Sequence, residues 1–145
     1  MAETSLVKKL GIKPGATLLI LHAPAGYLER LRPLPEGAEL RTNATPGERY
    51  DFVQVFVASI AELNACAASA IAAFRPNGGQ LWFCYPKKTG KIKTDITRDV
   101  GWEAVGAAGF LGVTLIAIDE TWSSLRFRPR SEIKSLTRKG SAPVR

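Results

Sequence analysis

The chain has 145 residues, of which 46% are hydrophobic and 23% are charged, and its 20 Lys and Arg against 13 Asp and Glu give a net charge of +7. This composition predicts one globular domain and excludes a disordered, collagen-like or disulfide-scaffold protein, while two cysteines and one histidine exclude a zinc ribbon or multi-histidine metal site. No apolar stretch is long enough to cross a membrane, and residues 1–5 lack the apolar core of a signal peptide, so we expect a soluble, cytoplasmic protein.

Four elements are predicted in the first 50 residues. Apolar residues at helical spacing predict a short helix over 4–10. The uninterrupted apolar run 17–22 lies between two proline-containing turns and is typical of a strand buried on both faces. Beyond it we expect a brief helix over 27–32 and a weaker strand, near a sheet edge, over 38–42.

The middle of the chain carries the clearest local signal. Ser59 and Glu62 have the spacing of a capping box, in which each side chain satisfies a free backbone N–H of the other residue, and this predicts the start of an alanine-rich helix over 60–74. Apolar strands are predicted on either side of that helix, over 51–57 and 80–85.

The last part of the chain is predicted to hold one helix, two strands and a tail. Asp95 can cap a helix, and four apolar residues share one face of it, namely Ile96, Val100, Ala104 and Ala108. The apolar run 113–118 predicts a further buried strand, and the alternating segment 124–128 predicts its antiparallel partner. Residues 131–145 contain few apolar side chains and are predicted to form a basic, flexible tail.

Alternating strands and helices followed by a hairpin predict an α/β fold. We expect a three-layer Rossmann-like sandwich, in one domain over 1–130, with a mostly parallel sheet of about six strands and a C-terminal antiparallel hairpin. The connection 43–50 is shorter than a parallel crossover normally needs. Either the weak strand at 38–42 is antiparallel, or this link crosses the end of the sheet without a helix.

The positive charge is concentrated in two segments. Lysines 87, 88, 91 and 93 place +4 in seven residues, and residues 126–145 carry +6, which leaves −3 for the rest of the chain. Ligands of such sheets bind beyond the carboxyl ends of the strands. This rule predicts a cleft, and the lysine segment beside it predicts that the ligand is an anion, held near the helix N-terminus at Asp95. The candidate ligand-binding residues are His22, Tyr27, Ser59, Tyr85, Lys87, Lys88, Lys91, Lys93 and Arg98.

Several segments resemble known proteins. The stretches 15–21, 50–55 and 74–82 resemble the first, fourth and fifth strand segments of class I S-adenosylmethionine-dependent methyltransferases, and the hairpin 113–128 resembles the final antiparallel pair of that fold. The motifs Ala23-Pro-Ala-Gly-Tyr27 and Thr121-Trp-Ser-Ser-Leu-Arg-Phe127, with others across the chain, resemble a family of small bacterial proteins of unknown function. The first resemblance implies a methyltransferase-like fold, and the second implies no activity.

The methyltransferase resemblance fails where the cofactor would bind. The turn after the first strand has a single glycine and a proline, Pro24, in place of a glycine-rich G-x-G-x-G pattern. The acidic residue that would hold the ribose is missing, since Arg41-Thr42-Asn43 occupies its place, and no further strand and helix fit between Thr42 and Tyr50. These departures argue against S-adenosylmethionine as a cofactor.

Other residues have structural interpretations. His22 could act as a general base, but without a neighbouring nucleophile motif a hydrogen-bonded position at a strand end is the simpler interpretation. Cys66 and Cys84 are expected to be buried structural thiols, and the three tryptophans to pack in the core or the hairpin.

The leading hypothesis is a non-catalytic or degenerate methyltransferase-like domain that binds an anionic ligand or partner at the carboxyl edge of its sheet. One alternative is a sequence-independent nucleic-acid binder that uses the lysine segment and the tail. The other alternative is a small methyltransferase-like enzyme, which would use His22 and Tyr85.

Overall fold

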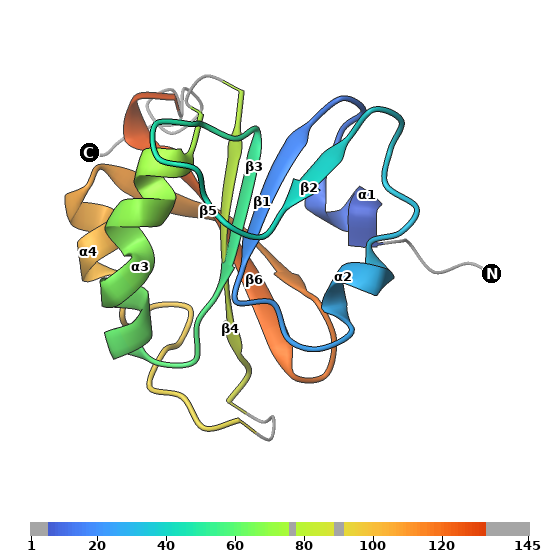
Figure 1. Ribbon diagram of the computed structural model, residues 1–145. Coiled ribbons are helices and arrows are strands. Elements are labelled where there is room, and N and C mark those ends of the chain that lie inside the picture. The colour runs from blue at the N-terminus through green and yellow to red at the C-terminus, as the bar shows by residue number, and fades with distance from the viewer. Residues whose placement is uncertain (1–5, 76–77, 89–91, 133–145) are drawn as a thin grey trace, which may run out of the picture.

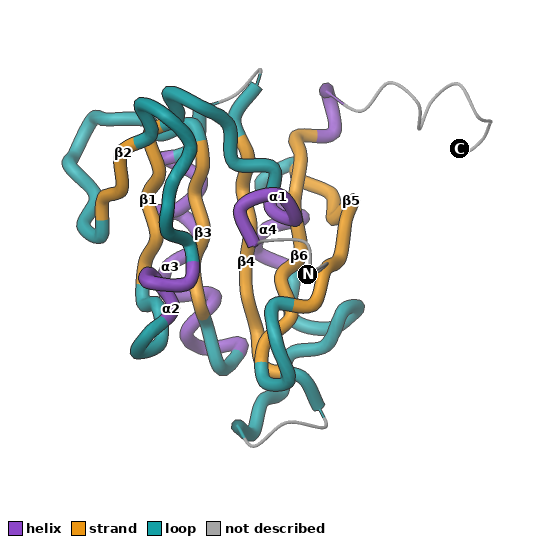
Figure 2. Tube along the Cα trace, turned by 90° about the vertical axis from the view of Figure 1, so that its right-hand side faces the viewer, coloured by secondary structure: helices purple, strands orange, loops and turns teal. Residues whose placement is uncertain are grey.

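A six-stranded mixed sheet forms the centre of the protein. The computed structural model describes residues 6–75, 78–88 and 92–132. The strands lie in the order β2-β1-β3-β4-β6-β5, as Figure 2 shows, with the first four parallel and the last two antiparallel to their neighbours. Their bounds are β1 Thr17–Leu21, β2 Glu39–Arg41, β3 Phe52–Phe56, β4 Gln80–Pro86, β5 Phe110–Ala117 and β6 Trp122–Pro129.

Helices cover both faces of this sheet. Figure 1 shows α3 (Ile60–Ala73) and α4 (Glu103–Ala107) on one side, and α1 (Leu6–Leu10) and α2 (Tyr27–Arg30) on the other. A 3₁₀ turn, Arg130–Glu132, follows β6. The predicted three-layer α/β sandwich with a C-terminal antiparallel hairpin is therefore confirmed. None of the described helices is long and apolar enough to cross a membrane.

The two central strands explain why the core has two halves. Every residue of β3 and β4 is buried, because the sheet is covered on both faces. Alternate side chains point to opposite faces, so that Val53 and Phe83 pack under α3 and α4, while Phe52 and Trp82 pack under α1 and α2.

The weak strand β2 lies at the sheet edge and is parallel to β1. It pairs only with the first part of β1, from Thr17↔Glu39 to Leu19↔Arg41, so it ends close to the level at which β3 begins beside Leu18. The link 42–51 can therefore reach β3 across the end of the sheet without a helix, and it contains no helix or strand. Of the two alternatives for this segment, the second is correct.

The helix predicted after Asp95 is wrong over most of its length. Residues 95–102 form bends, and only α4 is helical. Gly101 has φ +110°, and the hydroxyl of Thr97 accepts hydrogen bonds from the N–H groups of Asp99 and Val100, so the backbone turns locally instead of continuing as a helix. Ile96 is buried as expected, but Val100 is half exposed.

The strand predicted at 113–118 exists, but it is not central. As β5 it forms the outer edge of the sheet and pairs only with β6 among the described strands. Most of its residues are exposed. Its continuous apolar run had indicated burial on both faces, and this inference fails because α4 is only five residues long and cannot cover it. The predicted tail lies outside the described residues from 133 onward.

Candidate functional site

The strand order places a potential binding site between β1 and β3. The chain leaves β1 for β2 on one side and returns to β3 on the other side of β1, so the strand order reverses there. In open α/β sheets this reversal opens a crevice beyond the carboxyl ends of the strands. A cavity of about 630 Å³ lies at this position. It is lined by Leu21, His22, Phe56, Ala58, Glu62, Ala65, Cys66, Ser69 and Trp122. We refer to it as the carboxyl-edge cavity.

His22 lines this cavity from the end of β1. Its side chain is exposed, and its backbone has φ +60°, the only left-handed conformation of a non-glycine residue in the described chain. This conformation costs on the order of 1 kcal/mol in a residue with a Cβ atom. It turns the chain sharply away from the strand, with Pro24 two residues later. The backbone at the cavity is therefore held in a conformation that the surrounding structure must stabilise.

The start of α3 lies beside the cavity, and its free N–H groups are satisfied by the protein itself. The Ser59 hydroxyl accepts a hydrogen bond from the Glu62 N–H at 3.1 Å, which confirms Ser59 as the cap. Glu62 Oε1 accepts from the Ala58 N–H at 2.8 Å, one residue earlier than a standard capping box. Asp95 Oδ1 accepts from the Ile60 N–H at 2.8 Å. Asp95 thus caps α3 rather than a helix of its own, and no helix begins at Asp95.

The two predicted tyrosines lie away from the cavity, on opposite faces of the sheet. Tyr27 is 2% exposed, packs edge-on against Phe56, and donates a hydrogen bond to Gln54 Oε1 at 2.7 Å. Burial raises the pKa of its hydroxyl far above the usual range. Tyr85 is buried beside Trp102, and burial raises its pKa as well, against the opposing influence of Arg98. The predicted grouping of both tyrosines with His22 does not occur.

The lysine segment borders the cavity without lining it. The Lys87 N–H donates to the Thr121 carbonyl at 2.8 Å, and the next residue, Trp122, lines the cavity. Lys88 and Lys93 are exposed, and Lys91 lies outside the described residues. Among the residues that the structure describes, neither Lys87 nor Lys88 forms an ion pair with an acidic side chain.

Arg98 belongs to a different depression. It lines a cavity of about 320 Å³ with Trp102 and Phe127 on the α4 face, and its nearest acidic neighbour is Asp99, with 3.8 Å between Nη1 and Oδ1. Of the predicted ligand-binding residues, the structure therefore brings His22 into the carboxyl-edge cavity, with Ser59 and Lys87 next to its rim.

The sequence did not single out the α3 wall of the cavity. Glu62, Ala65, Cys66 and Ser69 follow the i, i+3, i+4, i+7 spacing of one helix face. A second stripe, Leu63, Ala67 and Ala70, is buried against the sheet. The polar stripe beside an apolar one is the signal that could have identified this wall. Cys66 is half-buried rather than fully buried, and burial raises the pKa of its thiol, which is therefore protonated at neutral pH.

Trp122 forms the opposite wall. Its ring packs edge-on against Phe56, with 5.1 Å between ring centroids. Asp119 holds the preceding turn, because its Oδ1 accepts from the N–H groups of Thr121 and Trp122, both at 2.8 Å. Arg30 of α2 donates to Asp119 Oδ2 at 2.9 Å and ties the hairpin to the other side of the sheet. The wall is thus rigidly placed.

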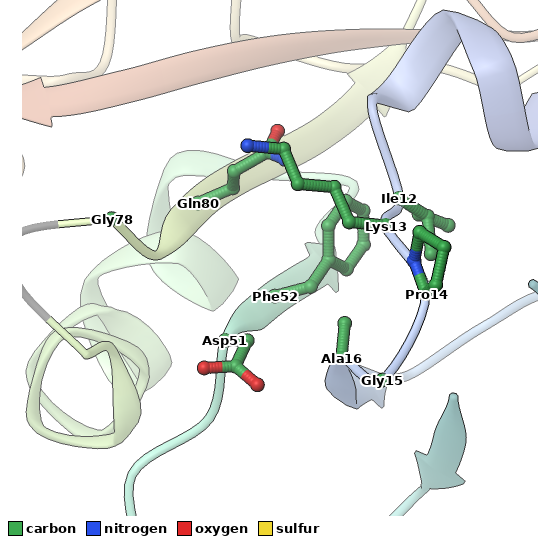
Figure 3. Close-up of a pocket in the computed structure, with 9 residues that line it drawn as sticks. All are labelled: Ile12, Lys13, Pro14, Gly15, Ala16, Asp51, Phe52, Gly78 and Gln80. Atoms are coloured by element: carbon green, nitrogen blue, oxygen red, sulfur yellow. The ribbon is translucent and has the colours of Figure 1, made fainter. Parts of the chain in front are cut away.

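The amino edge of the sheet holds a smaller cavity of about 210 Å³ (Figure 3). Its polar side chains are engaged by the protein. Asp51 accepts from the Thr17 N–H at 3.0 Å and pairs with Arg75, while Gln80 donates to the Gly11 carbonyl at 2.7 Å and accepts from the Trp82 indole. Figure 3 shows the Lys13 side chain extended toward Gln80. These bonds join the starts of three strands and the end of α1, so the arrangement fastens the fold.

Comparison with solved structures identifies the fold. The structure is similar to a ribosomal protein L11 methylase from Lactobacillus delbrueckii subsp. bulgaricus (TM-score 0.56, 11% identity, covering 86% of this chain and 74% of that chain). It is also similar to a SAM-dependent methyltransferase from Aquifex aeolicus (TM-score 0.55, 13% identity, covering 84% of this chain and 86% of that chain). A third similar structure is magnesium protoporphyrin IX methyltransferase from Synechocystis PCC 6803 with bound SAH (TM-score 0.56, 11% identity, covering 83% of this chain and 77% of that chain).

The fold is methyltransferase-like. No protein-family model and no curated protein matches the sequence. At these identities the similarity shows the architecture alone, so the chemistry of the site must be judged from its own residues.

The methyltransferase-like domain does not fit S-adenosylmethionine at the expected position. Gly26 is the only glycine of the turn after β1, and it serves as the left-handed N-cap of α2, with φ +84°. That helix has only four residues, so it offers no extended N-terminus to an anionic or polar group. β2 ends beside Leu19, two residues short of the end of β1, and its last side chain is Arg41, which pairs with Glu39. No carboxylate of β2 can therefore hold a ribose.

Proposed function

We propose that this chain is a non-catalytic, methyltransferase-like domain that binds an anionic small molecule in the carboxyl-edge cavity. The observation that carries the proposal is the cavity itself, about 630 Å³ in volume, at the position where the strand order reverses. This volume is large enough for a metabolite of moderate size.

The surroundings of the cavity favour an anion with a planar or apolar body. Trp122 and Phe56 provide an aromatic wall for such a body. Three of the nearby carboxylates are engaged, since Glu62 and Asp95 accept from backbone N–H groups and Asp119 pairs with Arg30, while Glu120 of the same turn is exposed. The Lys87 N–H is bonded to the Thr121 carbonyl beside Trp122, so Lys87 and its chain neighbour Lys88 add positive charge near the rim that attracts an anion.

The same residues support binding more than catalysis. The Cys66 thiol is held in its protonated form by burial, and a thiol nucleophile needs the opposite shift. His22 has no hydrogen-bond partner in the described part of the chain that would orient its ring for proton transfer. The residues of the cavity therefore recognise a ligand without an evident means to activate it.

Isothermal titration calorimetry against a panel tests this function. The panel holds nucleoside mono- and diphosphates, phosphorylated sugars, aromatic carboxylates, S-adenosylmethionine and a single-stranded RNA. We expect saturable binding of a small anion at one site. Lys87→Ala with Lys88→Ala should weaken it on the order of tenfold, while Lys13→Ala with Arg130→Ala removes the same charge at the amino edge and should leave it unchanged.

A steric pair of variants separates the cavity from the surface charge. Ala65→Phe places a ring inside the cavity and should abolish binding, whereas Ala68→Phe adds the same ring on an exposed position of α3 that does not line the cavity. Binding that survives Ala65→Phe would show that the ligand does not bind in the carboxyl-edge cavity. Binding of RNA alone, falling steeply with salt and insensitive to Ala65→Phe, would favour the nucleic-acid alternative.

A further inference from the structure

The two outer strands of the sheet differ in how they are protected against pairing with other chains. β2 has three residues, two of them charged, and Arg41 forms an ion pair with Glu39 at 2.8 Å. β5 has eight residues, Phe110–Ala117, without a charged residue or a proline. Short length, charge, proline and β-bulges are devices that protect exposed strands. β5 lacks the first three, and it has one irregularity, a register shift between Gly112 and Thr114 in its pairing with β6.

β5 is also the most exposed apolar strand of the protein. Val113 is 40% exposed and Leu115 is 42% exposed, and only two other large apolar side chains in the described chain are exposed to a similar degree. Figure 2 shows β5 at the outer end of the sheet, with no described helix or strand paired beyond it. The Lys9 ammonium donates a hydrogen bond to the carbonyl of Ala117 at 3.4 Å. This bond engages only the last residue of the strand.

The outer edge of β5 presents backbone donors and acceptors in strand geometry, so its complement is another strand. We propose that β5 pairs with β5 of a second copy of this chain, antiparallel about a two-fold axis, and joins two sheets into one of twelve strands. An isologous contact of this kind is self-complementary, because each copy supplies the same uncharged edge and the same Val113 and Leu115 side chains.

The strand itself carries no charge that would oppose pairing with a second copy. The chain has a net charge of +7, but β5 carries none of it, so two copies can approach along this strand without placing like charges opposite each other. The chain's own residues 133–145 are long enough for a strand, but they contain Lys134, Arg138 and Lys139 together with Gly140 and Pro143. That composition is poorly suited to a strand.

A single strand pair is a small interface beside the roughly 1,200–2,000 Å² of a standard stable complex, so we expect a reversible dimer. The test is sedimentation velocity of the full chain at concentrations from about 10 μM to about 1 mM. The matched variants are Val113→Lys, Leu115→Lys and, as a control at an exposed apolar residue outside the sheet, Val100→Lys. Circular dichroism and thermal unfolding confirm that each variant is folded.

We expect the wild type and Val100→Lys to dimerise as concentration rises, and both β5 variants to dimerise more weakly, on the order of tenfold or more. Added salt should strengthen the dimer, since it screens the repulsion between two chains of +7. Hydrogen exchange should show amides of 110–117 that become protected only at high concentration.

Three results would overturn the proposal. The first is a wild type that stays monomeric throughout the concentration range. The second is a dimer that is equally sensitive to Val100→Lys, or insensitive to both β5 variants. The third is a full chain that stays monomeric while a chain ending at Glu132 dimerises, which would show that residues 133–145 cover the β5 edge.

Discussion

The two ends of the sheet have opposite characters. At the amino end, Asp51 and Gln80 are bonded to neighbouring elements, and the cavity there measures about 210 Å³. At the carboxyl end the cavity measures about 630 Å³, His22 is held in a left-handed conformation, and two lysines without acidic partners in the described structure stand beside it. The amino end therefore holds strands together, while the carboxyl end is where we propose that a ligand binds. Changes at the first should lower stability, and changes at the second should alter binding.

The largest effect is expected from Gly79→Ala at the amino end. A Cβ atom at this buried position would lie 2.2 Å from the Arg75 carbonyl oxygen, so the backbone itself would have to move. We expect the free energy of unfolding to fall by about 3 kcal/mol or more, measured by urea denaturation. Gly106→Ala is the control, because nothing lies within 4 Å of its Cβ, and it should be neutral or stabilising. Equal effects of the two variants would contradict the close packing at Gly79.

Asp51→Ala removes the main polar junction of the amino end. The Thr17 N–H loses its acceptor and Arg75 loses its ion pair, keeping only its bond to the Arg49 carbonyl, so we expect a loss of about 2 kcal/mol in unfolding free energy. The measurement is again urea denaturation, with an unchanged affinity for the ligand as the second readout. A stable variant with weakened binding would reverse the roles assigned to the two ends.

Asp119→Asn tests the turn that positions Trp122. Burial opposes ionisation of Asp119, but hydrogen bonds from Trp122 and Thr121, together with Arg30, hold its pKa below the usual value. A lowered pKa in the folded state stabilises the fold above the unfolded pKa near 4, and this contribution is lost as pH falls through the folded pKa. Because the carboxylate is one-third exposed, we expect a cost of only about 1 kcal/mol at pH 7. The difference between wild type and variant should shrink as pH falls below the unfolded pKa and vanish below the folded pKa of Asp119. A constant difference across pH would contradict the ionic contribution.

The sequence predicted more of the fold than of the site. The apolar runs at 17–22, 51–57 and 80–85 were sufficient to place the central strands, because strands buried on both faces need uninterrupted apolar segments. The run at 113–118 has the same apolar pattern, but its strand lies at the edge of the sheet and is poorly covered. The helix that would cover it, α4, is short because of Gly101 and the hydrogen bonds of Thr97, and apolar spacing does not reveal either effect. Edge and centre could not be distinguished from periodicity.

The site was only partly predictable for a similar reason. The rule for carboxyl ends located His22 correctly, because it depends on chain order alone. It could not tell that Tyr27 turns into the core toward Gln54, or that Asp95 caps a helix 35 residues away. Both contacts depend on tertiary packing that local sequence does not specify.

The smallest effect is expected from His22→Gly at the carboxyl end. Glycine adopts φ +60° without strain, so this variant should raise the unfolding free energy by about 0.5 kcal/mol, after the greater flexibility of glycine in the unfolded chain is included. It should also weaken ligand binding in calorimetry, since the imidazole lines the cavity. A destabilised variant would show that His22 makes contacts essential to the fold.

Chemical-shift mapping distinguishes binding in the carboxyl-edge cavity from general attraction of anions to basic segments. A ¹⁵N-labelled sample is titrated with ADP and, separately, with inorganic pyrophosphate, which supplies the charge without the planar body. We expect saturable shifts clustered at residues 21–26, 58–69, 87–88 and 121–122, larger for ADP, including the Trp122 indole. Shifts that are spread over every basic segment, or that cluster at Lys13, Gly15 and Gln80 of the amino edge, would contradict this expectation.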